Sequence, residues 1–165
     1  MNRFFMLLYL CWARLVDEAT RDTLTGLLNR RGFNEALQQH GAIATRYARP
    51  LSLLLIDLRN LKAYNASEGY EAGDRILQKT AQILTRESRS ADVVCRIGGD
   101  EFALLLPETE LSASHIIEER LRRELHAADI DIHSGLASGK PDHLLSIADD
   151  VLRESKLSYS LNNAE

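Results

Sequence analysis

The sequence is poor in several features that mark specialised classes of protein. It has only two cysteines in 165 residues, Cys11 and Cys95, and neither belongs to a Cys-x-x-Cys motif or a cysteine–histidine cluster. Neither a disulfide framework nor a zinc site is therefore indicated, and buried free thiols in a reducing compartment are the simpler interpretation. The five histidines show no His-Glu-x-x-His spacing, so we read each as a surface or packing residue.

Surplus positive charge and long apolar runs are also missing. The net charge is −4, whereas a general nucleic-acid-binding protein would carry a basic surplus, so we expect no nucleic-acid partner. Uninterrupted apolar residues run only from Phe4 to Ala13, about half of what a bilayer requires, and no signal-peptidase-like site follows. We expect this segment to be a helix that packs on a partner or ends a longer upstream segment; a membrane-proximal helix is the alternative.

What remains is the composition of an ordinary globular domain, with 45% hydrophobic and 27% charged residues. The length suits one domain with a full core, and no internal repeat, low-complexity stretch or linker divides it. We therefore assign residues 1–20 to an N-terminal lead-in helix and residues 21–165 to a single domain.

Hydrophobic periodicity predicts an alternation of helices and strands in that domain. The expected helices cover 29–50, 70–88, 112–128 and 143–157, and the expected strands cover 51–56, 93–97, 102–107 and 129–138. Without the flanking helices the order is β-α-β-β-α-β, which is the ferredoxin-like α+β fold with helices packed on an antiparallel sheet. In that topology the first and third strands are neighbours at the centre of the sheet.

Acidic residues collect where this topology brings two strand ends together. Asp57 ends the first strand, and the predicted hairpin carries Gly98-Gly99-Asp100-Glu101. If Asp57 faces Asp100, three carboxylates converge, and like charges at that distance need a cation or a shared proton. Such hard oxygen ligands suit Mg²⁺ or Mn²⁺ bound to phosphates, and the two glycines would let a ligand approach the backbone. The alternative is that these are ordinary turn acids.

Four segments in the same order resemble the motifs of one known family, the GGDEF domains or diguanylate cyclases. The segments are DTLTGLLNRRGF (22–33), LLLIDLRNLKAYNASEGYEAGD (53–74), RIGGDEFALLLP (96–107) and SIADDVLRESK (146–156). The resemblance implies a core related to nucleotidyl-cyclase and polymerase palms. It also implies a cytoplasmic enzyme of bacterial second-messenger signalling, which joins two GTP into cyclic di-GMP and releases two pyrophosphates. Because each domain would hold one GTP, catalysis would require a homodimer, with an upstream sensor or membrane segment as a further possible partner.

The resemblance also implies a role for individual residues. The catalytic pair would be Asp100, which helps deprotonate the attacking hydroxyl, and Glu101. The divalent metal would be held by Asp57, the carbonyl of Leu58, Asp100 and Glu101. The substrate would be bound by Lys62, Lys156, Gly98, Gly99 and backbone N–H groups of residues 58–62, with Asn65 and Asp74 reading guanine. Product would inhibit the enzyme at an Arg-x-x-Asp site formed by Arg89 and Asp92.

The sequence departs from the family pattern at several positions. The unusual residues are Arg59 for the second acid of Asp-x-Asp, Leu61 for an aromatic residue, Ala66 for an acid, Tyr70 for a histidine, Arg153 for a tyrosine and Ser160 near the place of a phosphate-binding arginine. These departures leave two alternatives to an active cyclase. One is a domain that holds GTP or cyclic di-GMP without turnover, as a receptor, and the other is a purely structural dimerisation domain.

Overall fold

The computed structural model describes Met6 and residues 19–162 of the chain. Nearly all of the expected lead-in helix, with its membrane-proximal alternative, lies outside the described residues, so the division at residue 20 stays a prediction. Within the part of the chain that the structure describes, no helix is both long and apolar enough to cross a membrane.

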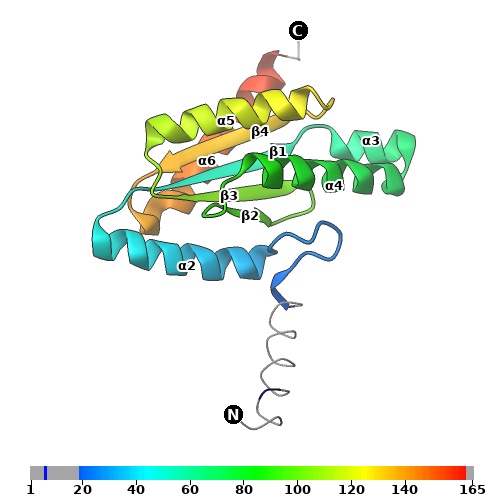
Figure 1. Ribbon diagram of the computed structural model, residues 1–165. Helices are drawn as coiled ribbons and strands as arrows, with labels where there is room; N and C mark the ends of the chain where they lie inside the picture. Colours follow the sequence, from blue (N-terminus) through cyan, green and yellow to red (C-terminus); the bar gives the residue numbers. More distant parts are fainter. Residues whose placement is uncertain (1–5, 7–18, 163–165) are drawn as a thin grey trace.

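A four-stranded antiparallel sheet forms the centre of the fold (Figure 1). Its strands are β1 (Leu51–Leu58), β2 (Val93–Arg96), β3 (Glu101–Pro107) and β4 (Ile132–Ser138), in the order β2-β3-β1-β4. The pairs β1–β3, β1–β4 and β2–β3 are all antiparallel. This is the predicted ferredoxin-like arrangement, with the first and third strands at the centre.

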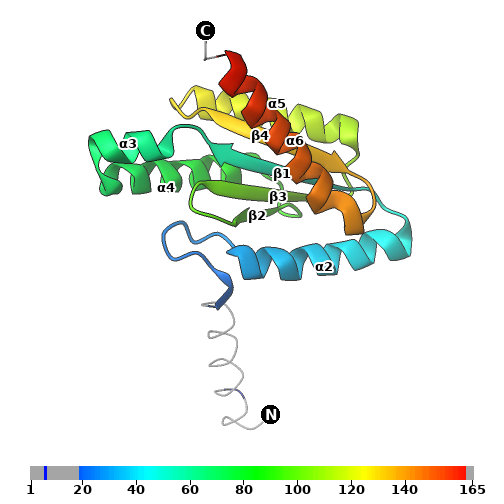
Figure 2. The same ribbon diagram turned by 180° about the vertical axis from the view of Figure 1, so that it is seen from behind.

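Helices cover both faces of the sheet. Helices α4 (Tyr70–Glu87) and α5 (Leu111–His126) lie on one face, while α2 (Arg30–Tyr47) and α6 (Pro141–Asn162) lie on the other (Figures 1 and 2). Alternate residues of β1 enter two separate cores: Leu54, Ile56 and Leu58 pack with α4 and α5, and Leu53 and Leu55 pack on the side of α2 and α6. All eight residues of β1 are buried for this reason, which explains why its sequence is continuously apolar from Leu53 to Ile56.

The connection after β1 differs from the prediction. A short helix, α3 (Leu61–Glu68), follows the strand where we expected a loop over 58–62. Asn60 precedes it in the left-handed region at φ 59°, and Gly69 separates it from α4 at φ 87°. Figure 1 shows α3 and α4 side by side at one end of the domain.

Two other boundaries moved for local reasons. The strand expected over 129–138 begins only at Ile132, because Asp129 has a left-handed φ of 61° and its N–H bonds the carbonyl of His126 in a turn. The last helix, expected over 143–157, continues to Asn162.

Helix α6 lies directly on the backbone of β4 at Gly135. A Cβ atom added there would lie 2.1 Å from the carbonyl oxygen of Ala148 and 2.5 Å from the amide nitrogen of Leu152. Only glycine allows so close an approach between a strand and a helix. The contact sets the height of α6 above the sheet, and the last turns of the helix then pass over the end of β1.

Candidate functional site

The end of β1 and the β2–β3 hairpin meet, as the sequence predicts. The Leu58 N–H donates to the Asp100 carbonyl over 3.0 Å, and the β1–β3 register places Asp57 opposite Glu101. The residue directly across from Asp57 is therefore Glu101 rather than Asp100. Cross-strand neighbours lie on the same face of a sheet, so these two side chains share the face that α2 and α6 cover.

Lys156 reaches this end of β1 from α6. Its Nζ donates to Oδ2 of Asp57 over 2.6 Å, with 12% of the Asp57 side chain and 39% of the Lys156 side chain exposed. A largely buried carboxylate is costly without a positive partner. Lys156 supplies that partner across 99 positions of sequence.

The carboxylates at this end do not form a ready-made cluster. Among the described residues, no three histidine, cysteine or acidic side chains lie close enough together to hold a metal ion. Asp57 is paired with Lys156 instead, and Oε2 of Glu101 lies 3.7 Å from Nη2 of Arg30. The expected convergence of three carboxylates is therefore not seen among the described residues: Asp57 pairs with Lys156 and Glu101 lies near Arg30, which avoids repulsion between like charges.

The donor set nevertheless fits a hard cation. Mg²⁺ is usually held by one or two carboxylates together with substrate phosphates, and it needs no complete protein cage. The cross-strand pair Asp57 and Glu101, with the backbone beside Leu58, provides oxygen donors of that kind at one end of the sheet.

The two glycines of the hairpin have different surroundings. A Cβ on Gly98 would lie 2.5 Å from Oε2 of Glu101, whereas a Cβ on Gly99 would meet nothing within 4 Å. Gly98 thus makes room for the Glu101 side chain, and only Gly99 leaves open space for a ligand. This refines the expectation that both glycines admit a ligand.

Residues 22–33 contact the hairpin through side-chain hydrogen bonds. Arg96 donates to the Gly99 carbonyl over 2.7 Å and to both carboxylate oxygens of Asp22 over 3.1 and 3.2 Å. Burial alone would raise the pKa of Asp22, but hydrogen bonds from Thr25 and the Arg96 guanidinium hold that pKa below its usual value. Arg30 adds a hydrogen bond from Nε to the Ile97 carbonyl over 2.9 Å. Sequence reasoning quoted the segments 22–33 and 96–107 without giving Asp22, Arg30 or Arg96 a role.

The two residues expected to read guanine come from neighbouring helices. Asn65 lies on α3 and Asp74 on α4, and a Cβ added to Gly73 would lie 1.8 Å from Oδ1 of Asn65. Gly73 therefore lets Asn65 approach the helix turn that carries Asp74. Oδ1 of Asn65 is a buried acceptor with no hydrogen-bond partner among the described residues, and a base with N–H donors would satisfy it.

The expected phosphate cradle over 58–62 is smaller than predicted. The N–H of Leu58 donates to Asp100, and the N–H of Arg59 donates to the Asp131 carbonyl over 2.9 Å. Both groups are occupied by backbone partners, so only the start of α3 remains, where Lys62 lies exposed in the first turn.

Comparison with known proteins decides the family. Residues 19–159 match the family described as diguanylate cyclase, GGDEF domain. The chain belongs to the GGDEF diguanylate cyclase family. A relative, diguanylate cyclase DosC of Escherichia coli K12, is 35% identical over 153 residues, which cover 84% of this chain and 33% of DosC. The chain thus spans about a third of the length of such curated relatives.

Solved structures agree with this assignment. The GGDEF domain of DgcB from Caulobacter crescentus, in complex with c-di-GMP, has a TM-score of 0.80 and 28% identity, covering 85% of this chain and 91% of that one. Diguanylate cyclase SiaD from Pseudomonas aeruginosa, in complex with its activator SiaC, has a TM-score of 0.83 and 28% identity, covering 94% of this chain and 65% of that one.

Arg59, one of the departures from the GGDEF pattern, contacts residues of α6 and of the segment before β4. Its guanidinium carbon lies 3.6 Å from the ring centroid of Tyr159, and Nη1 lies 3.6 Å from Oδ2 of Asp131. The His133 ring packs edge-on against Tyr159, with centroids 5.3 Å apart. Burial, followed by the charge of Arg59, lowers the pKa of His133, against an opposing effect of Asp57. Sequence reasoning missed Tyr159, Asp131 and His133, which carry no motif.

Beside the GGDEF hairpin, a cleft of about 490 Å³ opens between α2 and α6. Its polar lining is mainly acidic, with Asp142, Asp149 and Glu101 against the single cation Arg30. The negative charge of this lining does not favour an anionic triphosphate.

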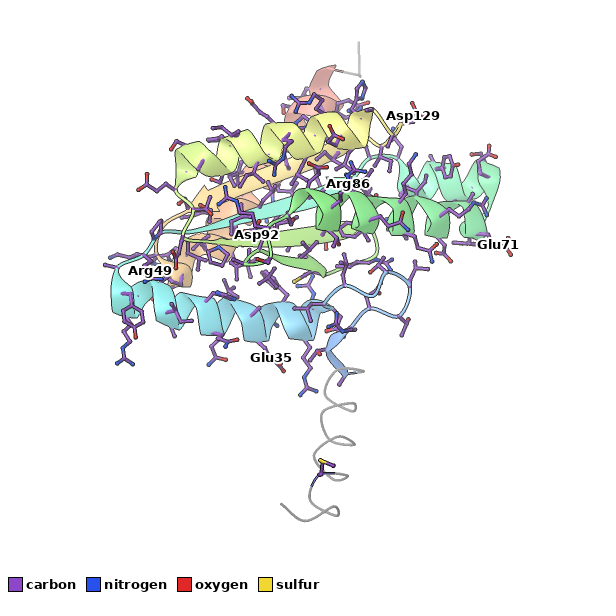
Figure 3. All side chains as sticks on the ribbon, viewed as in Figure 1. Glu35, Arg49, Glu71, Arg86, Asp92 and Asp129 are labelled. Atoms are coloured by element: carbon purple, nitrogen blue, oxygen red, sulfur yellow. The ribbon has the colours of Figure 1, made fainter. Side chains whose placement is uncertain are left out.

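Arg89 and Asp92 lie at the opposite end of the sheet from the GGDEF hairpin. Figure 3 labels Asp92 and Arg49 toward one end of the domain and Glu71, at the start of α4, at the other. Oδ2 of Asp92 accepts a hydrogen bond from the Arg89 N–H over 2.8 Å, and the Asp92 N–H donates back to the Arg89 carbonyl over 3.0 Å. Asp92 also lines a cleft of about 470 Å³ together with His40, Arg49 and Glu108.

Proposed function

We propose that this chain is a diguanylate cyclase that condenses two GTP into cyclic di-GMP and two pyrophosphates. In this reaction the 3′-hydroxyl of each GTP attacks the α-phosphate of the other. The observation that carries the proposal is the junction at the end of β1, where Asp57 lies opposite Glu101 and the Asp100 backbone is fixed to Leu58. Membership of the GGDEF family supports it.

The acidic residues at this junction suit phosphoryl chemistry, which depends mainly on positioning and charge stabilisation. Magnesium or manganese, held by Asp57, the Leu58 carbonyl, Asp100 and Glu101, would neutralise phosphate charge and lower the pKa of the attacking hydroxyl. Asp100, at the tip of the hairpin, accepts the hydroxyl proton. The Arg96 and Asp22 contacts hold that tip in place.

Lys156 balances Asp57 in the structure. Once the Asp57 carboxylate is balanced by another cation, the ammonium becomes available to the triphosphate. The same side chain thus pairs with Asp57 and binds substrate. Lys62 and the open face at Gly99 border the path of the phosphates.

Guanine specificity follows from Asn65 and Asp74. Guanine presents adjacent N1–H and N2–H donors, which a carboxylate accepts as a pair, and the unpartnered Oδ1 of Asn65 is a further acceptor. Adenine lacks this donor pair and would leave Asp74 unpaired, which is a strong basis for rejection.

Two further parts complete the proposal. A two-fold homodimer brings two half-sites together, because each domain holds one GTP. Product binds at Arg89 and Asp92 and inhibits the enzyme, with the arginine able to grip a phosphate bidentately. The enzyme acts in the cytoplasm, where its substrate GTP is found, with residues 21–165 as the cyclase domain and residues 1–20 as its connection to an upstream partner.

The receptor alternative has one specific observation in its favour. Ser160 stands near the place of the phosphate-binding arginine, and its hydroxyl donates to the Lys156 carbonyl over 3.0 Å, so it points back to its own helix. A site without that arginine would bind nucleotide and turn it over poorly.

Incubating the purified chain with GTP and Mg²⁺, followed by chromatography for cyclic di-GMP, separates the two functions. We expect cyclic di-GMP and pyrophosphate, formed at a rate that rises with the square of protein concentration while dimers are scarce. If no product forms at high protein concentration while calorimetry still detects binding of GTP or cyclic di-GMP, the cyclase proposal is wrong and the receptor function stands.

A further inference from the structure

Two basic side chains approach the end of β1 on the same face. Asp57 and Arg59 are two positions apart on the same chain segment, and their partners Lys156 and Tyr159 are three positions apart on α6. Arg59 is the first residue after β1, and residues at i and i+3 of a helix, as Lys156 and Tyr159 are, lie about 5–6 Å apart. The ammonium and the guanidinium are therefore neighbours over the same end of the sheet.

The Arg59 guanidinium is held in place but its hydrogen-bonding capacity is unused. Its flat face lies on the Tyr159 ring at 3.6 Å, and 20% of its side chain is exposed. Nε is buried and has no hydrogen-bond partner among the described residues, and Nη1 stands 3.6 Å from Oδ2 of Asp131, beyond hydrogen-bond distance. A guanidinium with five donors, largely removed from water and without a hydrogen-bonded anion, is costly to keep.

We propose that Arg59 is a substrate-binding residue that forms, with Lys156, a two-cation subsite for the terminal phosphates of the nucleoside triphosphate. The inference rests on the proposed function in that it places a triphosphate at this site. A phosphate oxygen accepts from a guanidinium fork and neutralises the charge. Tyr159 positions the fork, and Ser160, which is turned back to the helix, leaves this role to a residue from another element.

Binding measurements test the subsite without turnover. We would titrate the full chain in Mg²⁺ with 3′-deoxy-GTP, which lacks the attacking hydroxyl, and with 3′-deoxy-GMP, which lacks the terminal phosphates. Arg59→Gln should weaken 3′-deoxy-GTP binding about tenfold or more, the usual effect of losing a charge-assisted contact, and should change 3′-deoxy-GMP binding less than about twofold. Arg59→Lys, which keeps the charge without the fork, should lie between wild type and Arg59→Gln.

Arg31→Gln is the matched control, because Arg31 is an exposed arginine of α2 that pairs with Glu35 within its own helix. It removes the same charge and should leave both affinities unchanged. If Arg59→Gln weakens the binding of both ligands equally, or of neither, the proposal of a two-cation subsite is wrong. Should Arg59→Gln fail to fold by circular dichroism, Arg59→Lys decides alone, and wild-type affinity for 3′-deoxy-GTP in that variant overturns the role of the fork. Selective loss of the triphosphate in a chain that makes no cyclic di-GMP would refute the cyclase and leave the subsite standing.

Discussion

The two ends of the sheet use acidic residues in opposite ways. At the hairpin end, Asp57 pairs with Lys156 from α6, and the pair of Asp22 and Arg96 ties the distant segment 22–33 to the hairpin. At the other end, the Asp92 carboxylate bonds the backbone of its own turn, three residues away.

This difference separates what a substitution would damage. The hairpin end is assembled from elements far apart in sequence, so its geometry depends on the whole fold. The Arg89–Asp92 turn is held by hydrogen bonds within four residues, so a substitution there should leave the hairpin end intact. Substitutions at each end of the sheet test this difference.

Asp100→Asn should have the largest effect. The substitution keeps the size of the side chain and removes its charge and basicity at the hairpin tip, and we expect cyclic di-GMP formation to fall by about a hundredfold or more. Product formation from GTP measures the loss, and the thermal midpoint should stay unchanged. Asp150→Asn, on an exposed position of α6, is the control. Full activity in Asp100→Asn would contradict the assignment of the hairpin as the reacting end.

Gly73→Ala should act on guanine binding alone. The added Cβ would meet Oδ1 of Asn65 at 1.8 Å and displace that side chain, while alanine favours a helix over glycine by about 1 kcal/mol. We expect a folded protein of equal or higher thermal midpoint whose affinity for GTP and GMP falls together, by about tenfold. Loss of GTP affinity with GMP affinity retained would show that Asn65 does not contact the base.

Arg89→Ala should relieve product inhibition without reducing the initial rate. The arginine side chain is exposed and both of the hydrogen bonds between Arg89 and Asp92 use the Arg89 backbone, so the turn should survive the change. The concentration of cyclic di-GMP needed for half inhibition should rise about tenfold or more. Arg86→Ala, which removes an arginine paired with Glu87 and Glu124, serves as the comparison. Unchanged inhibition in Arg89→Ala would remove the product site from this end.

Cys95 provides the most local test, which concerns the packing of the hairpin rather than activity. Burial raises its pKa from 9.0 to about 12, and Leu28 of the segment 22–33 bridges to it in the folded chain. In a Cys11→Ser background at pH 8, native Cys95 should react with a thiol reagent roughly a thousandfold more slowly than the unfolded chain. Its contribution to stability is fully present below pH 9 and is lost as pH rises through about 12. Rapid labelling would show that residues 22–33 leave the hairpin readily.

Much of this fold could be predicted because its strongest signals are local. The apolar run of β1 and the glycine hairpin identified three of the strands. The β-α-β-β-α-β order of elements then placed the first strand beside the third and Asp57 beside the hairpin. Helix α3 was missed because it has eight residues, with Leu61 its one buried residue, and it lies between residues of positive φ, Asn60 and Gly69. So short a helix leaves no periodic stripe to detect.

The missing parts of the candidate site are contacts between distant residues. Lys156 was named for the site, but its 2.6 Å pairing with Asp57 depends on where α6 crosses the sheet. Tyr159 carried no signal at all, since a stack with Arg59 becomes visible only when both elements are placed. Arg59 was noticed only as an exception to a pattern.

Gly135 has a consequence for how this protein can change. The site's lysine and its stacking tyrosine both sit on α6, and the height of that helix is set by the absence of a side chain on β4. In a saturation library selected for cyclase activity, position 135 should return glycine alone, although Gly135 itself has no role in the proposed chemistry. The missing side chain at Gly135 thus sets the distance between β4 and α6. Through that distance it also sets where Lys156 and Tyr159 lie over the end of β1.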